Sequence, residues 1–418
     1  MRAAALLGSH QTCHYKLQHD YVSQTPSELL PVSPRGSRAH LRNPICVRAG
    51  LAADFEGLAS KRRVFVFCLQ LVEPPTHSAP MLRGAATKTL RLTPPRRTLK
   101  LLVGAHNVPH PDKPPGEDAF YASSTHAALG VADGVGGSKR AGVDPGAFSR
   151  RLLAHAVTER TGALEAVVRA RTAVKKDELC KKGGSSTLLV ATLDGAALTV
   201  SNLGDSALII LRPTPRTRGD AVSLWPRILL KTQDQTHYFN CPYQASAADD
   251  DATDGDLGAC GADTLTAAVR AGDVVIAATD GYWDNVFDSA TLATVAPRLP
   301  ALWASAAHQN AFGVELSRRV QRMTDAAEAR DPARDALDAL AEALAGVAVA
   351  IGVDATAVTP FSASARDDGL AFEGGKEDDV AIVCGLVVDD AVELSAVDEA
   401  PRHNFASVLT DAEARSLV

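Results

Sequence analysis

The stretch Ala128-Leu-Gly-Val-Ala-Asp133-Gly134 joins a short apolar run to an acidic residue and a glycine. The same arrangement recurs in Val274-Val-Ile-Ala-Ala-Thr-Asp280-Gly281 and, with the acids first, in Glu377-Asp378-Asp379-Val-Ala-Ile-Val-Cys384. A strand that is buried on both faces reads as a continuous apolar run. An Asp at its end is therefore either a turn former or a carboxylate that points out of the sheet, and three such ends in one domain can form a site.

Two-residue turns separate three β-rich runs further along the chain. Asp194-Gly195 lies between the runs 185–193 and 196–203, and Gly204-Asp205 lies between the second run and 206–212. Such turns between β-rich runs are strong hairpin signals. We therefore expect a three-stranded antiparallel meander here.

Helix signals lie between the β-rich runs. Asp144-Pro145 is an N-cap followed by proline at the first helical position, and it predicts a helix to about Arg160 and a second helix from Ala163 to Leu179. A later helical block runs from Asn310 to about Leu344, broken at Pro332. Antiparallel strands interleaved with helix pairs favour an α+β layered fold over a parallel βαβ repeat.

Charge divides the chain into parts. Residues 1–98 carry fourteen Lys/Arg against five acidic residues, about +9, so that with a total of −6 the remainder is near −15. An acid-poor, Arg-rich and Ser-containing start is typical of an organelle transit peptide, mitochondrial or chloroplast, although a basic tail of a cytoplasmic protein or a nucleic-acid-binding leader remains open. We expect a basic leader and linker at 1–98, a catalytic domain at 99–392 and a C-terminal tail at 393–418.

Cysteine usage and hydropathy limit the class of protein further. Seven cysteines without a C-x-x-C pair argue against a disulfide framework and a zinc site, and favour a reducing compartment. The longest apolar stretch, Ala343–Val353, is shorter than the roughly 20 residues that a bilayer span needs. We expect a soluble protein without a membrane span.

Carboxylates dominate the candidate site. A fourth acidic element, Gly116-Glu117-Asp118-Ala119-Phe120, lies at the mouth of another expected strand. Oxygen ligands without His or Cys select Mg²⁺ or Mn²⁺. Two such cations bridged by one carboxylate can activate a shared water and hold a phosphoryl group for in-line displacement. Each Asp-Gly element alone is most simply a turn, so the argument for a site depends on all four together.

Six motifs, in order, resemble those of the type 2C (PPM-type) metal-dependent protein serine/threonine phosphatases over about Leu99 to Asp389. Some details are similar to the mitochondrial and plastid subgroup related to the T-cell activation protein phosphatase. The motifs are Gly116-Glu-Asp-Ala119, Val131-Ala-Asp-Gly-Val-Gly-Gly137, Gly184-Ser-Ser-Thr187, Asn202-Leu-Gly-Asp-Ser206, Ala278-Thr-Asp-Gly-Tyr-Trp-Asp-Asn285 and Gly374-Gly-Lys-Glu-Asp-Asp-Val380.

The resemblance implies an αββα sandwich, in which two antiparallel sheets are flanked by helix pairs, with a binuclear Mn²⁺ or Mg²⁺ centre at one end. By position, Asp133 would bridge both ions and Gly134 would offer its backbone carbonyl. Asp280 and Asp378 would ligate the second ion.

Three further acidic residues have implied roles in the same centre. Glu117 and Asp118 would hold metal-bound waters. Asp205 matches a position that in some members helps to bind a weak third ion, and it reads equally well as a hairpin-turn Asp.

The chain departs from the family pattern at two catalytic positions. Lys113 stands where many members have an Arg that holds the substrate phosphate, and Lys offers the charge without the bidentate fork. Val135 stands where many members have a His proposed as general acid, which leaves the proton donor open. The histidines considered as substitutes are His106, His110 and His237. The stretch Ala339–Val358 has no match in the subgroup, and we expect it to remodel a flap or loop beside the site.

These observations predict a monomeric protein phosphatase acting on phosphoserine and phosphothreonine proteins through a water shared by two ions. The alternative is a pseudophosphatase, a module that binds phosphoproteins without turnover. A two-metal nuclease is disfavoured because a domain near −15 would repel a nucleic acid.

Overall fold

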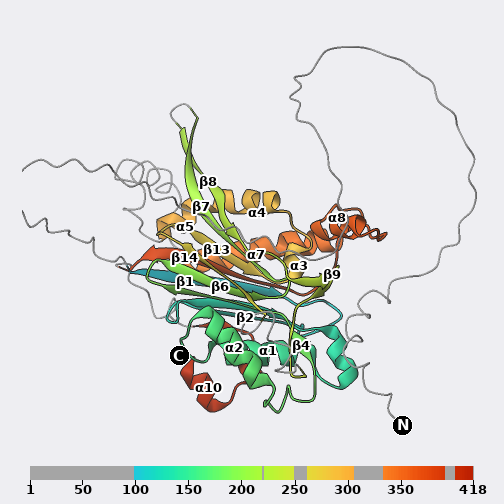
Figure 1. The fold of residues 1–418 in the computed structure, drawn as a ribbon. Coiled ribbons are helices and arrows are strands. Elements are labelled where there is room, and N and C mark those ends of the chain that lie inside the picture. The colour runs from blue at the N-terminus through green and yellow to red at the C-terminus, as the bar shows by residue number, and fades with distance from the viewer. Residues whose placement is uncertain (1–97, 219–220, 249–260, 306–332, 391–400, 418) are drawn as a thin grey trace, which may run out of the picture. The chain divides into compact units, whose positions relative to one another are not determined.

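The computed structural model describes residues 98–218, 221–248, 261–305, 333–390 and 401–417 (Figure 1). The expected leader up to residue 97, residues 249–260 and the first part of the expected later helical block, up to residue 332, lie outside the described residues. Among the residues that are described, no helix combines the length and apolar character needed to cross a bilayer.

Two antiparallel sheets form the centre of the fold. The five-stranded sheet has the order β1-β14-β13-β7-β8, and the six-stranded sheet has the order β12-β6-β5-β3-β2-β15. The strands of the first are β1 (Leu99–Val108), β14 (Val380–Asp389), β13 (Val274–Ala278), β7 (Ala207–Arg218) and β8 (Ala221–Lys231). Those of the second are β12 (Asp263–Ala268), β6 (Ala197–Leu203), β5 (Leu188–Asp194), β3 (Ala128–Asp133), β2 (Asp118–Ser123) and β15 (Arg402–His403).

Four short strands and the helices complete the described elements. The short strands pair as β4 (Ser185–Ser186) with β11 (Ala245–Ser246) and β9 (Thr236–Tyr238) with β10 (Cys241–Pro242). The α-helices are α1 (Pro145–Val157), α2 (Ala163–Val174), α3 (Asp280–Trp283), α4 (Asp288–Val295), α5 (Leu299–Ser305), α7 (Ala333–Gly352), α8 (Pro360–Asp367) and α10 (Asp411–Ser416). The 3₁₀ helices are η1 (Gly136–Ala141), η3 (Ala296–Arg298) and η4 (Ala406–Val408).

Helices cover the outer face of each sheet, which confirms the predicted αββα sandwich. Helices α1 and α2 pack on the six-stranded sheet, and α7 packs on β1 and β14 of the five-stranded sheet (Figure 1). Alternate residues of the buried strands face different layers: Leu129 and Val131 of β3 join the core between the sheets, whereas Ala128 and Ala132 join the core under α1 and α2. This double burial explains why the central strands read as continuous apolar runs.

The predicted first helix pair is confirmed. Asp144 caps α1 by accepting a hydrogen bond from the Gly146 backbone N (3.0 Å), with Pro145 at the first helical position. Both helices end a few residues earlier than expected, at Val157 and Val174.

The predicted three-stranded meander is only half correct. Strands β5 and β6 form the expected hairpin, but β7 leaves them and pairs with β13 and β8 in the other sheet. Gly204 makes this crossing possible, because its φ of +115° is in the region that favours glycine and an added Cβ would lie 2.7 Å from the Thr187 side chain. A Gly-Asp pair permits either a hairpin or a crossing, so the local sequence does not distinguish them.

The expectation of a flap in the stretch 339–358 is wrong for its larger part. Residues 333–352 form one continuous helix, α7, whose Leu337, Leu344 and Ala348 are buried in the core. The helix lies very close to β1, since a Cβ on Gly104 would be 2.5 Å from the Asp338 backbone N. The larger part of this stretch therefore belongs to a core helix, and the close approach of that helix to β1 depends on Gly104.

The segment expected as a C-terminal tail contributes to the sandwich. β15 extends the six-stranded sheet by pairing with β2, and Arg151 of α1 contacts Glu413 of α10 (Nη1–Oε2 2.8 Å). A two-residue strand carries no periodicity that a sequence reading could detect.

Cys180 and Cys384 are buried free thiols, whereas Cys241 takes part in a disulfide, contrary to the expectation from cysteine spacing.

Candidate functional site

Five predicted site carboxylates lie at one edge of the sandwich, where strands of both sheets begin or end. Asp133 is the last residue of β3 and pairs directly with Asp118, the first residue of β2. From the other sheet, Asp280 follows β13 and opens α3, and Asp378 lies two residues before β14. Glu117 precedes Asp118, and all of these except the partly exposed Asp378 are buried.

A hydrogen-bond chain joins the two sheets at this edge. Thr279 Oγ1 donates to Asp118 Oδ2 (2.7 Å) and accepts from the Ala381 backbone N (3.0 Å). Burial raises the pKa of Asp118 well above its usual value, and the charges of Asp133 and Asp379 raise it further. The carboxylates from the two sheets therefore act on one another, and together they form a strongly negative buried cluster.

Asp133 is held in place through its own backbone. Its N–H donates to Thr187 Oγ1 (3.0 Å), and the Thr187 N–H donates to the Asp133 carbonyl oxygen (3.0 Å). Thr187 Oγ1 also lies 3.2 Å from Ser206 Oγ. Thr187, which directly precedes β5, thus positions Asp133.

Both Asp-Gly pairs need their glycine for space. A Cβ on Gly134 would lie 2.2 Å from the Pro145 carbonyl oxygen, and a Cβ on Gly281 would lie 1.9 Å from the Asp379 carbonyl oxygen. These neighbours are backbone atoms, which cannot move aside as a flexible side chain would. The glycines allow the chain segments that carry the carboxylates to approach closely.

Asp379 organises the loop that carries Glu117, a role that the sequence did not reveal. Its Oδ1 accepts from the His110 backbone N (2.7 Å) and its Oδ2 accepts from the Glu117 backbone N (3.0 Å). Asp378 Oδ1 in turn accepts from the Asp379 N–H (3.0 Å). Of the two adjacent acids, Asp379 is thus directed at backbone amides, whereas Asp378 faces the cluster of charged side chains.

Three lysines meet the acidic cluster. Lys113 Nζ lies 3.2 Å from Glu117 Oε2 and 3.8 Å from Asp378 Oδ1. Lys139 Nζ lies 2.9 Å from Glu117 Oε1. Lys376 Nζ lies 2.7 Å from Asp280 Oδ2. The structure thus places Lys113 at the site, as the sequence suggested. It adds Lys376, whose only sequence signal was its place in the motif 374–380, and Lys139, which lies outside the motifs.

The donor set fits a hard divalent cation in its chemistry, because it consists of carboxylate and carbonyl oxygens that are largely buried. In the part of the chain that the structure describes, however, no group of three or more His, Cys, Asp or Glu side chains is arranged as a ready metal cage. Glu117, Asp280 and Asp378 form ion pairs with lysines in this arrangement. A divalent cation would have to share these oxygens with the lysines or displace them.

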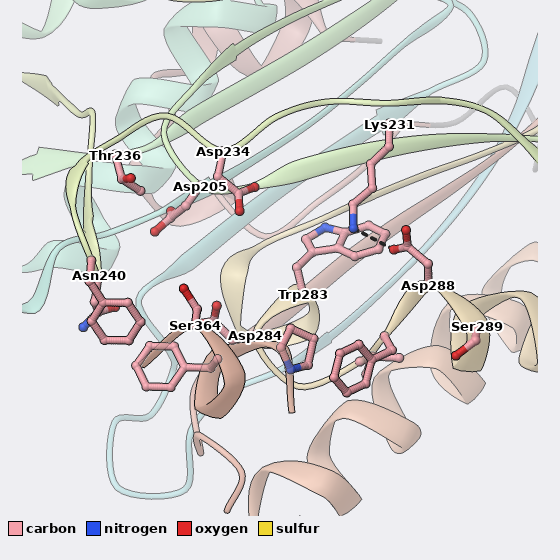
Figure 2. Close-up of a pocket in the computed structure, with 15 residues that line it drawn as sticks. Asp205, Lys231, Asp234, Thr236, Asn240, Trp283, Asp284, Asp288, Ser289 and Ser364 are labelled. Atoms are coloured by element: carbon pink, nitrogen blue, oxygen red, sulfur yellow. Dashed lines mark hydrogen bonds and ion pairs between the residues drawn. The ribbon is translucent and has the colours of Figure 1, made fainter. Parts of the chain in front are cut away.

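A cavity of about 460 Å³ opens beside the acidic cluster. Figure 2 shows Asp205, Asp234 and Asp284 on its walls, with Lys231 above the ring of Trp283. Lys231 Nζ lies 4.6 Å from that ring centroid and 2.7 Å from Asp288 Oδ1. Asp205 therefore lies in the cavity wall, on the turn between β6 and β7.

The cavity and the cluster are electrostatically linked. Burial raises the pKa of Asp234, the Lys231 charge opposes this shift, and the charge of Asp280 adds to it. Asp284 reaches both regions, since it lines the cavity and contacts Lys376. A ligand in the cavity would therefore lie within the field of the acidic cluster.

The histidines considered as proton donors have other contacts. His106 lies in β1 opposite Ile382, and the His110 ring accepts from the Asp112 N–H (Nδ1, 3.1 Å). The His237 ring packs 4.3 Å from that of Tyr243. The Val135 N–H donates to the Ser185 carbonyl (3.0 Å). These contacts position backbone and rings, and they do not identify a proton donor.

The aromatic pair that follows Asp280 and Gly281 belongs to the core. Tyr282 is fully buried and its hydroxyl lies 2.8 Å from Thr291 Oγ1. Trp283 Nε1 donates to the carbonyls of Ala207 (3.0 Å) and Ala278 (3.1 Å). One edge of the Trp283 ring nevertheless reaches the cavity wall.

Comparison with known proteins finds clear relatives, although no family model matches the chain. It is 33% identical over 297 residues to "Probable protein phosphatase 2C 55" of Arabidopsis thaliana, covering 70% of this chain and 52% of that protein. It is 31% identical over 320 residues to "Probable protein phosphatase 2C 26" of the same plant, covering 71% and 87%. With "Protein phosphatase PTC7 homolog fig" of Drosophila virilis the identity is 29%, covering 64% and 77%. The chain thus spans about half the length of the first of these relatives.

The solved structures that the chain matches include the photosystem II phosphatase PBCP, at 25% identity and a TM-score of 0.48, covering 68% of this chain and 98% of that one. The catalytic domain of the serine/threonine phosphatase PstP, solved with two manganese ions, has 18% identity and a TM-score of 0.40, covering 70% and 100%.

Proposed function

Since this chain belongs to the protein phosphatase 2C family, we propose that it is a protein serine/threonine phosphatase that hydrolyses phosphate esters on phosphoserine and phosphothreonine. The observation that carries the proposal is the meeting of Asp133 and Asp118 from one sheet with Asp280 from the other, in mutual electrostatic contact. Such a concentration of buried carboxylates is unfavourable without cations. It is a suitable environment for the electrostatic work of phosphoryl transfer.

We propose that the cluster holds two Mn²⁺ or Mg²⁺ ions. Asp133 would bind both through its carboxylate, and Gly134 would offer its backbone carbonyl. Asp280 and Asp378 would hold the second ion. Bound ions would supply the Lewis acidity that activates water and neutralises the phosphoryl charge. Asp205, on the cavity wall, is proposed as a ligand of a weaker third ion.

The chain's own residues would orient the reactants. Glu117 and Asp118 would orient the attacking water by accepting its hydrogen bonds. Lys113, whose side chain is one-third exposed beside Glu117, would pair with the substrate phosphate as a point charge. Lys139 lies beside the other oxygen of Glu117 and would help to hold that carboxylate in position.

We further propose that the cavity of Figure 2 receives the polypeptide that flanks the phosphorylated residue. Its walls combine aromatic surface from Trp283 and Phe361 with the carboxylates of Asp205, Asp234 and Asp288. Lys231 is the cation among its wall residues. Charge complementarity therefore favours a substrate with a basic side chain close to the phosphorylated residue.

The test of the function is a release assay on the purified full chain. With MnCl₂, it should release phosphate from a phosphothreonine peptide and from p-nitrophenyl phosphate, and EDTA should stop both reactions. Binding of the phosphopeptide without release of phosphate would contradict the proposal and would indicate a pseudophosphatase instead.

Residues 1–98 are proposed to direct the protein to a mitochondrion or a chloroplast, on the basis of their composition alone. A fluorescent protein fused behind residues 1–98 should co-localise with one of these organelles. Diffuse cytoplasmic fluorescence would contradict this assignment.

The catalytic protein is proposed to be monomeric, which light scattering of the purified chain would check.

A further inference from the structure

Lys376 is a buried cation inside the acidic cluster. Its Nζ lies 2.7 Å from Asp280 Oδ2 and 3.3 Å from Asp378 Oδ2, and it contacts Asp284 as well. The Phe361 ring covers it from another side, with its centroid 5.1 Å from Nζ. Only 12% of the side chain is exposed. One ammonium group thus joins three carboxylates, two of which belong to the proposed metal ligands.

The surrounding backbone fixes where this ammonium can lie. The Lys376 N–H donates to Asn285 Oδ1 (2.9 Å), and Asn285 Nδ2 donates to the Lys376 carbonyl (2.8 Å). Asn285 Nδ2 also donates to the Gly281 carbonyl (2.9 Å), which ties the segment to α3. A Cβ on Gly375 would lie 2.0 Å from the Ile351 carbonyl oxygen, so the chain before Lys376 is tightly packed against α7. The fold therefore fixes the segment that carries Lys376, and its ammonium group is directed into the acidic cluster.

The charge on Lys376 is strongly favoured. Its ammonium group lies within ion-pairing distance of the carboxylates of Asp280, Asp284 and Asp378, and little of the side chain reaches solvent. Removing a buried cation from such partners leaves uncompensated carboxylates, which is strongly destabilising. Asp280 and Asp378 thus need a cation, and Lys376 provides one from within the chain.

We propose that Lys376 is a built-in counter-cation of the metal centre, which holds Asp280 and Asp378 in place when they bind no divalent ion and competes with such an ion for them. This inference rests on the proposed role of those two residues as ligands of the second ion. In this role Lys376 is a positioning residue, and it lowers the affinity of the site for the second divalent ion. The enzyme would consequently respond to changes in free divalent cation rather than remain saturated at low concentration.

The test uses Lys376→Met in the full chain, because methionine keeps the unbranched length and removes the charge. After metal removal, the variant should unfold at a lower temperature than the wild type. MnCl₂ should raise the unfolding temperature more in the variant than in the wild type, because a ligand at a given concentration stabilises the folded state more when its Kd is lower. Calorimetric titration should give a Kd for Mn²⁺ on the order of tenfold lower in the variant, a difference of about 1.4 kcal/mol.

Two controls separate this role from a general loss of stability. Arg212→Met removes another cation from a buried carboxylate, Asp273 (Nη2–Oδ2 2.7 Å), and should lower the unfolding temperature without changing the Mn²⁺ response. Lys376→Arg keeps the charge and should retain the wild-type Kd for Mn²⁺. If Lys376→Met does not fold without metal, Lys376→Gln takes its place in the calorimetric titration.

The outcomes distinguish this inference from the proposed function. Equal or weaker Mn²⁺ binding by Lys376→Met and Lys376→Gln, beside a wild type that binds Mn²⁺ and hydrolyses phosphopeptide, would overturn the inference alone. A wild type that neither binds Mn²⁺ in calorimetry nor releases phosphate would overturn both.

Discussion

Thr279, at the end of the five-stranded sheet's β13, donates its hydroxyl hydrogen to Asp118, at the start of the six-stranded sheet's β2, over 2.7 Å. The same hydroxyl accepts from the Ala381 backbone N–H. This single side chain therefore connects both sheets at the edge where the candidate site lies, and it orients a carboxylate whose pKa burial raises well above its usual value.

Thr279→Val should disturb both stability and activity. The substitution keeps the shape but leaves the buried Ala381 N–H without its acceptor and Asp118 without its donor, which costs about 1–3 kcal/mol. Urea denaturation and phosphopeptide hydrolysis would measure the two effects. Thr199→Val, on β6 with its hydroxyl 3.0 Å from that of Thr266 in β12, is the matched control and should change both by little.

Asp133→Ala, Asp280→Ala and Asp378→Ala should each abolish metal-dependent hydrolysis, with a rate loss on the order of 10²–10³-fold or more, because each removes an oxygen donor that the reaction's charge depends on. Steady-state assays with MnCl₂ on p-nitrophenyl phosphate would measure the loss, and circular dichroism would verify the fold. Asp194→Asn, at the exposed last residue of β5, is the control. Wild-type rates in all three alanine variants would remove the mechanism.

The glycine after Asp280 should tolerate no side chain. In Gly281→Ala the new Cβ would lie 1.9 Å from the Asp379 carbonyl oxygen, so we expect a destabilisation of about 1–3 kcal/mol or more, with loss of activity. Gly346→Ala is the opposite case, since Gly346 lies in α7 with nothing within 4 Å of an added Cβ. It should stabilise the protein by about 0.5–1 kcal/mol. Thermal denaturation of the two variants would measure both effects. A similar unfolding temperature for Gly281→Ala and Gly346→Ala would contradict the argument from close contact.

Stability should depend on acid pH through Glu413. Hydrogen bonding to Arg151 lowers the pKa of Glu413 to about 2, from an ordinary value of 4.5. Because the folded-state pKa is the lower one, the stabilisation is complete above about 4.5 and is lost as the pH falls towards about 2. The carboxylate is partly exposed, so solvent screening reduces its contribution to about 1 kcal/mol.

Urea denaturation of Glu413→Gln against the wild type would measure this contribution. The difference in unfolding free energy should be largest near neutral pH and should shrink as the pH falls below about 4.5. A difference that is independent of pH would indicate a packing effect of α10 and not a charge effect.

The cavity should affect peptide substrates and not small ones. Asp234→Asn should raise KM for a phosphopeptide with an adjacent arginine by about two- to fivefold, the effect of one partly exposed ion pair. The same variant should leave hydrolysis of p-nitrophenyl phosphate unchanged. A parallel change for both substrates would show that the substitution disturbs the acidic cluster and that the cavity does not receive the peptide.

Local sequence was sufficient for the strand ends that form the site. Asp133, Asp280 and Asp378 each stand at the end of an apolar run, because burial on both faces demands such a run and the site demands a carboxylate just beyond it. The two Asp-Gly glycines were equally visible, although their reason, a backbone oxygen about 2 Å from any added Cβ, appears only in the structure.

The sheet to which β7 belongs and the packing of α7 could not be predicted from the sequence, because both depend on which distant segments contact each other. The turn at Gly204-Asp205 is compatible with a hairpin, yet pairing with β13 takes β7 into the other sheet. The Ala-rich stretch carries no family motif, yet its larger part lies in α7 and packs Leu344 and Ala348 into the core. In both cases the segments that pack against the element determine its place in the fold, and the local sequence pattern does not.

The amino-acid sequence by itself determined the family, the layered α+β class and the acidic strand ends, because periodicity, turn residues and ordered motifs are local properties. Only the tertiary structure decided that Asp379 serves backbone amides and that Lys376 pairs with Asp280, a residue 96 positions away. Ion pairs depend on distances in space, and such distances between remote residues exist only after the two sheets have packed.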